Sequence, residues 1–190
     1  MASKKKAKEL TKVYQIKVAL KEIRPPIWRR LEVLSDTTLE ELHLIFQLAM
    51  GWGNCHLHQF TIGGIEYGQS DPDYGSEMED ERKVKLYQVA PKENVKFIYE
   101  YDFGDSWQHT VLIEKILPAE KGKHYPICVK GKRACPPEDI GGPWGYPDFI
   151  EAILDTAHPE HEDMLEWIGG EFDPEAFNIE KINENLKQIR

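Results

Sequence analysis

The sequence predicts an α+β domain with an antiparallel sheet built from hairpins, one helix between the first two hairpins, and C-terminal helices packed on the sheet. Three observations lead to this prediction. Apolar and polar residues alternate near the N-terminus, an apolar stripe with helical spacing follows, and Gly63-Gly64 separates two short apolar runs. Alternation is the period of a half-buried strand, and paired glycines suit a tight hairpin turn that needs positive φ.

The length of 190 residues suits one domain with a substantial core. We expect residues 1–12 to form a flexible basic tail and residues 13–190 to form the domain. Residues 13–20 alternate as a strand, and residues 27–34 are its predicted partner beyond a Pro-Pro turn. A helix over 39–50 follows, which Gly51 can end, and then a hairpin over 56–67.

The second half begins with residues 71–81, which hold six carboxylates and are expected to form a mobile acidic loop. Residues 95–101 and 107–116 alternate as a third hairpin around a turn at 102–105. Residues 117–147 are rich in Pro and Gly, and we expect 125–146 to be ordered and folded back beside the hairpin end. Helical stripes follow, and Asn178 is the predicted cap of the last helix.

Charge and cysteine content exclude several classes of protein. The chain carries 33 acidic and 24 basic side chains, and the net charge of −9 argues against binding to duplex nucleic acid. Three cysteines are too few for a disulfide scaffold, which favours a cytoplasmic location. No apolar run is long enough to span a membrane, so we expect no membrane partner.

The first candidate site is the pair His56-Leu57-His58. Residues two apart on a strand share a face, so both imidazoles can point at one metal ion. The alternative is that these are two polar residues at the start of a strand whose later members, Phe60 and Ile62, enter the core.

The second candidate is the hairpin end from Tyr101 to His109, which concentrates carboxylates, an imidazole and aromatic rings. Carboxylates with a histidine can bind a metal or perform acid–base chemistry. In the alternative interpretation, the aspartates cap their own turn and the aromatic rings are core. A third candidate is Cys128 and Cys135 followed by Pro136-Pro137-Glu138-Asp139, in which the cysteines are expected to be buried structural thiols and the two carboxylates can cap the following turn or line a site. Kinase, Walker-loop, dinucleotide-binding and serine-hydrolase motifs are missing from the sequence.

Four motifs together resemble the plasmid pRiA4b open-reading-frame-three-like family. They are Pro26-Ile27-Trp28-Arg29-Arg30-Leu31, Gly51-Trp52 with His56-Leu57-His58-Gln59-Phe60, Tyr99-Glu100-Tyr101-Asp102-Phe103-Gly104-Asp105-Ser106-Trp107, and Cys135-Pro136-Pro137-Glu138-Asp139. The resemblance runs from about Val13 to the C-terminal helices and implies an α+β fold with antiparallel strands. It brings no catalytic residues with it. Members often carry a further cysteine where this chain has Ile140, so a three-thiol metal site is not implied here.

These observations favour a binding module for a small molecule or a protein, with one composite polar and aromatic site. Its expected binding residues are Tyr101, Asp102, Asp105, Trp107, His109, Glu138, Asp139 and Trp144. The expected metal ligands are His56, His58 and His109, with a divalent metal such as zinc as the candidate cofactor. The alternative function is a metal-dependent hydrolase that uses His56, His58, His109 and Asp102 or Asp105 as ligands.

Overall fold

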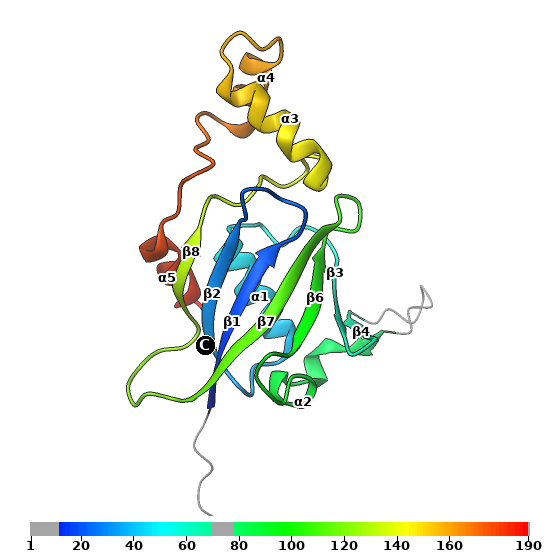
Figure 1. Ribbon diagram of the computed structural model, residues 1–190, viewed down its shortest axis with the longest axis vertical. Helices are drawn as coiled ribbons and strands as arrows, with labels where there is room; N and C mark the ends of the chain where they lie inside the picture. Colours follow the sequence, from blue (N-terminus) through cyan, green and yellow to red (C-terminus); the bar gives the residue numbers. More distant parts are fainter. Residues whose placement is uncertain (1–11, 70–77, 190) are drawn as a thin grey trace, which may run out of the picture.

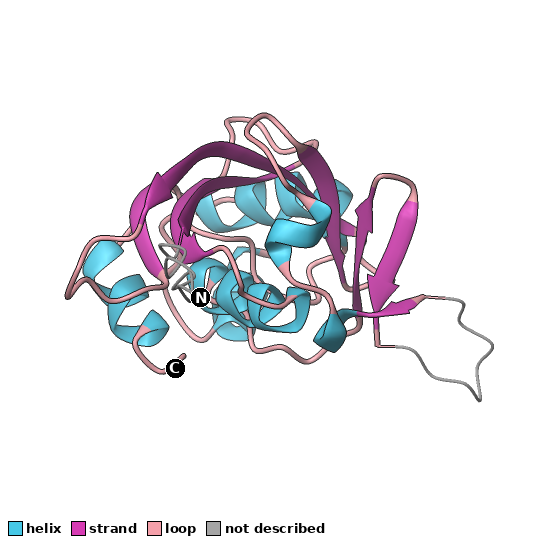
Figure 2. Ribbon diagram, turned by 90° about the horizontal axis from the view of Figure 1, so that it is seen from below, coloured by secondary structure: helices cyan, strands magenta, loops and turns pink. Residues whose placement is uncertain are grey.

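A computed structural model describes residues 12–69 and 78–189, and it contains one eight-stranded sheet that curves over a layer of helices (Figures 1 and 2). The strands follow the spatial order β5-β4-β3-β6-β7-β1-β2-β8. Their bounds are β1 Lys12–Leu20, β2 Trp28–Leu34, β3 His58–Ile62, β4 Ile65–Gly68, β5 Glu79–Asp80, β6 Lys96–Tyr101, β7 Trp107–Pro118 and β8 Ile127–Lys132. The helices are α1 Leu39–Met50, the 3-10 turn η2 Glu81–Lys83, α2 Leu86–Val89, α3 Gly142–Leu154, α4 His161–Ile168 and α5 Ile179–Leu186.

The predicted α+β class and the largely antiparallel sheet are confirmed. β1 pairs with β2, β3 with β4 and β6 with β7 as antiparallel neighbours, and the short β4–β5 pair is parallel. The inner faces of the strands supply the core: Tyr14, Ile16 and Val18 are each at most 2% exposed. They belong to one apolar cluster with Leu42 and Phe46 of α1, so burial of these side chains holds the helix against the sheet.

Helix α1 begins at Leu39, and a capping box holds its first turn. Thr38 is the N-cap: its side chain accepts a hydrogen bond from the backbone of Glu41, whose carboxylate accepts one from the Thr38 backbone. Gly51 ends the helix with φ 97°. This placement fixes the direction in which the next residues, 52–57, leave the helix toward the end of β6.

Strand β8 lies inside the segment that the sequence analysis expected to be irregular. It pairs with β2 and forms one edge of the sheet. The side chain of Asn183 in α5 covers this edge: it accepts a hydrogen bond from Cys128 N at 2.7 Å and donates one to Cys128 O at 3.0 Å. The strand was missed because its six residues include a glycine and lie among prolines and glycines.

The three C-terminal helices occupy two places. α5 contacts β8 and α1, whereas α3 and α4 pack on each other beyond the end of the sheet, at the top of Figure 1. The C-terminal helices were expected to pack on the sheet. This holds for α5, whereas α3 and α4 pack chiefly on each other. Asn178 caps α5 as predicted, accepting a hydrogen bond from Lys181 N. Among the described residues, no helix is long and apolar enough to cross a membrane.

The expected acidic loop over 71–81 is described only from Met78 onward. Residues 70–77 lie outside the described residues, and so do residues 1–11 of the expected tail over 1–12, whereas Lys12 is the first residue of β1. Glu79 and Asp80 form β5, and Glu81 begins η2 with 1% exposure. Glu81 is therefore a buried carboxylate, and its inclusion in a solvated loop is wrong. Its partner, described below, is a histidine that the sequence analysis assigned to a metal.

Candidate functional site

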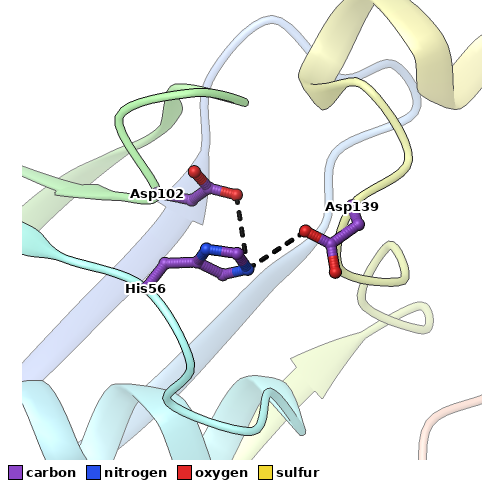
Figure 3. A group of neighbouring side chains, drawn as sticks. All are labelled: His56, Asp102 and Asp139. Carbon is purple, nitrogen blue, oxygen red and sulfur yellow. Dashed lines mark ion pairs between the residues drawn. The ribbon is translucent and has the colours of Figure 1, made fainter.

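Three segments far apart in the sequence meet at the end of the β6–β7 hairpin. They are the loop between α1 and β3, the turn between β6 and β7, and the segment between β8 and α3 (Figure 1). Each contributes one side chain to a small group, which Figure 3 shows: His56, Asp102 and Asp139. The Nε2 atom of His56 lies 3.6 Å from Asp102 Oδ2 and 3.1 Å from Asp139 Oδ1.

The Nε2 atom of His56 is shielded from solvent and, among the described residues, makes no hydrogen bond of good geometry. The two carboxylates are close enough for ion pairing, yet neither forms a hydrogen bond with Nε2: Asp102 Oδ2 is too distant, and Asp139 Oδ1 is within reach but not suitably aligned. The three donor atoms lie within 4.8 Å of one another. We call His56, Asp102 and Asp139 the carboxylate–histidine triad.

The backbone places both carboxylates in left-handed conformations. Asp102 has φ 58° and Asp139 has φ 61°, a region that aspartate tolerates better than most residues. In Asp102 the two carboxylate oxygens act separately: Oδ1 accepts a hydrogen bond from Gly104 N at 3.0 Å, and Oδ2 faces His56. The turn-capping interpretation of Asp102 therefore accounts for only one of its oxygens.

The hydroxyl group of Tyr101 connects the three segments. It accepts hydrogen bonds from Cys55 N at 2.9 Å and His56 N at 3.3 Å, and it donates one to Glu138 Oε1 at 2.5 Å. The other oxygen of Glu138 accepts a hydrogen bond from Gly53 N at 2.8 Å. Burial, followed by the hydrogen bond to Glu138, raises the pKa of Tyr101, so the hydroxyl keeps its proton. Tyr101 and Glu138 thus fix the loop that carries His56.

A buried polar network lies behind this loop. His43 Nδ1 is 2.8 Å from the Tyr99 hydroxyl and His43 Nε2 is 2.7 Å from Asn54 Oδ1, while Gln47 Nε2 donates to the same hydroxyl. Burial, and next the neighbouring His58, lowers the pKa of His43 to about 3. The neutral ring therefore donates from Nε2 to Asn54 and accepts at Nδ1 from Tyr99. His43 was not among the expected metal ligands, and it is a core residue whose two ring nitrogens both have hydrogen-bond partners.

His58 does not join the triad. It is the first residue of β3, so His56 precedes the strand and the two imidazoles do not share a strand face. The ring of His58 stacks on His43 with centroids 3.4 Å apart, and its Nε2 lies 2.8 Å from Glu81 Oε2. His58 and Glu81 are 5% and 1% exposed, so this is a buried pair. No sequence signal distinguished Glu81 from its acidic neighbours.

His109 and Trp107, both expected at the surface, are 0% exposed. They belong to the inward face of β7 together with Val111 and Ile113, so the strand's alternation directs them into the core. Burial lowers the pKa of His109 to about 4. His109 is therefore a core residue, and it does not belong to the carboxylate–histidine triad.

Asp105 and Trp144 lie outside the triad and line another cavity together. Asp105 Oδ2 accepts a hydrogen bond from Gly141 N at 3.2 Å, and a Cβ added to Gly142 would lie 2.1 Å from Asp105 O. This close approach docks the segment before α3 on the hairpin end, where the sequence analysis expected it. Trp144, one of the expected binding residues, is 80% exposed on α3.

Comparisons with known proteins match a family model and a relative over most of the chain. Residues 12–181 match the family described as plasmid pRiA4b ORF-3-like protein. The chain is 39% identical over 179 residues to the uncharacterized protein y4hQ of Sinorhizobium fredii (strain NBRC 101917 / NGR234), covering 93% of this chain and 92% of that protein.

A solved structure supports the same assignment. The protein of unknown function MM3350 from Methanosarcina mazei Go1 is 41% identical, with a TM-score of 0.81 over 90% of this chain and 97% of that one. The match over nearly the whole length, in sequence and in fold, leads to one conclusion: this chain belongs to the plasmid pRiA4b ORF-3-like family.

Proposed function

We propose that this protein is a ligand-binding module whose ligand site contains a divalent metal ion held by His56, Asp102 and Asp139. The single observation that carries the proposal is the environment of His56 Nε2. This atom is shielded from solvent and has no hydrogen bond of good geometry among the described residues, although two carboxylate oxygens lie 3.1 and 3.6 Å away. A cation between the three atoms would satisfy all of them at once.

The spacing of the donor atoms supports this proposal. Two metal–ligand bonds of about 2.1 Å that meet at 90° to 109° place their ligand atoms about 3.0–3.4 Å apart. The 3.1 Å distance from His56 Nε2 to Asp139 Oδ1 lies inside this range, and the 3.6 Å distance to Asp102 Oδ2 lies slightly above it. One imidazole nitrogen with two carboxylate oxygens suits zinc, manganese or ferrous iron, and three protein ligands leave coordination positions open for a further ligand.

A second support comes from the residues behind the ligands. The Tyr101 hydroxyl holds the backbone of the His56 loop, and Glu138, adjacent to Asp139, accepts the hydrogen bond from that hydroxyl. Partners of this kind orient metal ligands and raise metal affinity. Hydrolysis is not part of the proposal, because His58, His109 and Asp105 are absent from the group of possible ligands.

The test is a zinc titration by calorimetry on protein first treated with a chelator, compared with the variants His56→Gln, Asp102→Asn and Asp139→Asn. We expect one site per chain in the parent protein and a loss of more than about 100-fold in affinity in each variant, because each removes a direct ligand.

The matched control is Asp105→Asn, which removes an equal charge from the same turn but leaves the triad intact. We expect this variant to bind zinc within a few-fold of the parent protein. A parent protein that binds no divalent metal would refute the proposal. Equal losses in Asp105→Asn and Asp139→Asn would also refute it, since they would indicate a diffuse attraction to negative charge.

A further inference from the structure

A cavity of about 270 Å³ lies directly beside the triad. Its walls include residues of the loop before β3 and one residue of the β6–β7 turn, and His56 is among them. His56 therefore belongs both to the triad and to the cavity wall. A metal ion bound to His56 would lie at the edge of this cavity, within reach of a molecule that occupies it.

Apolar side chains flank the triad on the cavity side. Leu57 follows His56 and is 62% exposed, and Phe103 follows Asp102 and is 45% exposed. Both line the cavity. Exposed apolar side chains are ordinary when scattered, but these two come from different segments and meet at one small cavity. They offer contact area for the apolar part of a bound molecule.

The cavity also has a fixed polar wall. His58 lines it, and the hydrogen bond from Nε2 to Glu81, together with the stack on His43, holds the His58 ring in one orientation. Ligand pockets combine apolar walls with a few polar groups that are placed in advance. His58 is such a group, although it stands outside the triad.

Charge and size restrict the chemistry of the occupant. Among the described residues that line the cavity there is no lysine or arginine, so it lacks the groups that usually bind phosphate. An anionic group there would depend on the metal ion for its attraction. The volume falls below the range of about 300–1,000 Å³ that is typical of pockets for drug-sized ligands, which favours a small metabolite.

We propose that this cavity binds a small carboxylate with an apolar group, whose carboxylate occupies an open position on the metal held by the triad and whose apolar group lies against Leu57 and Phe103. The inference rests on the proposed metal site and goes beyond it by naming the class of ligand. His58 orients the molecule through its fixed ring edge, and the metal supplies the attraction for the negative charge.

The experiment uses the full chain and benzoate as the test ligand. The zinc affinity is measured first, and benzoate is then titrated into zinc-loaded and into chelator-treated protein. We expect benzoate to bind the zinc-loaded protein and to bind the zinc-free protein at least about tenfold more weakly. Benzamide, which lacks the charge, should bind the zinc-loaded protein at least about tenfold more weakly than benzoate does.

Two variants test the walls. The double variant Leu57→Ser/Phe103→Ser should keep its zinc affinity but bind benzoate at least about tenfold more weakly, because it loses apolar contact area. Both side chains are exposed, so the fold tolerates the change. The matched control is Ile65→Ser, which removes a similarly exposed side chain outside the cavity and should leave benzoate binding unchanged.

The outcomes separate the two proposals. Zinc binding without benzoate binding overturns the ligand inference and leaves the metal site standing. Benzoate binding that is equal with and without zinc, or equal in the double variant and the parent, also overturns it. If the parent protein binds no zinc, both proposals fail, and the first titration alone reveals this.

Discussion

Replacing Tyr101 by Phe removes the hydroxyl that connects the three segments of the site. Three hydrogen bonds are lost, to Cys55 N, His56 N and Glu138 Oε1. A buried polar group left without a partner costs about 1–3 kcal/mol, but water can reach the two backbone N–H groups because Cys55 is exposed and His56 is partly exposed. The main cost is the half-buried Glu138 oxygen, so we expect a loss of about 1–2 kcal/mol in the free energy of unfolding.

The matched control is Tyr99→Phe. Its hydroxyl is fully buried between Gln47 and His43 and bonds none of the three triad residues, so we expect a larger loss of stability, about 2–3 kcal/mol, because water cannot replace it. Metal affinity should show the opposite order. Tyr101→Phe should weaken zinc binding about tenfold or more, whereas Tyr99→Phe should leave it within a few-fold.

Urea denaturation of metal-free protein and zinc titration by calorimetry measure the two quantities separately. Equal zinc affinities for Tyr101→Phe and the parent protein would refute the positioning role of this hydroxyl. The reasoning would also be wrong if Tyr99→Phe weakened zinc binding as much as Tyr101→Phe, because the effect would then follow general destabilisation.

Three further predictions concern stability and binding partners. Burial lowers the pKa of His43 from 6.5 to about 3, so on acidification the unfolded chain takes up a proton at this residue before the folded protein does. The contribution of the neutral His43 ring to the free energy of unfolding is therefore complete above about pH 6.5 and decreases below it. Between pH 7 and pH 4.5 the free energy of unfolding of the parent protein should fall by about 2–3 kcal/mol from this residue alone. Urea denaturation should show a smaller fall over the same pH range in His43→Gln than in the parent protein. Gly142→Ala should lower the free energy of unfolding by at least about 2 kcal/mol more than Gly122→Ala. Both glycines have positive φ, but only at Gly142 does a backbone atom, Asp105 O, occupy the space of the new Cβ. Equal melting temperatures of the two variants would contradict this. With a net charge of −9, the chain should not shift duplex DNA at sub-micromolar protein and physiological salt, which a gel mobility assay checks.

Local patterns predicted much of the fold. The alternation in β1 and the helical spacing in α1 reflect burial of one face of each element, so these elements could be predicted from the residues themselves. β8 could not, because its pairing with β2 joins segments about 100 residues apart in the sequence, and its short sequence gives no clear period. The burial of Glu81 could not be predicted from the sequence either, because its neighbours in the sequence are exposed or acidic.

The candidate site was predicted in part, and the reason lies in the start of β3. The prediction that His56 and His58 share a face assumed that both lie on the strand, but the strand begins at His58. The strand thus begins two residues later than predicted: His58 lies on its inward face beside Glu81, and His56 stays in the preceding loop with Asp102 and Asp139. Both carboxylates had been named as binding residues, but only their long-range docking brought them to His56.

In the proposed site, His56, Asp102 and Asp139 hold one divalent metal ion. Anomalous diffraction at the zinc edge, from crystals of the full chain grown with zinc, tests it most directly. We expect one strong peak within about 2.1 Å of His56 Nε2 and of a carboxylate oxygen from each aspartate. A density map with no peak at this position, or with the zinc bound at His58 and Glu81 instead, would contradict the account.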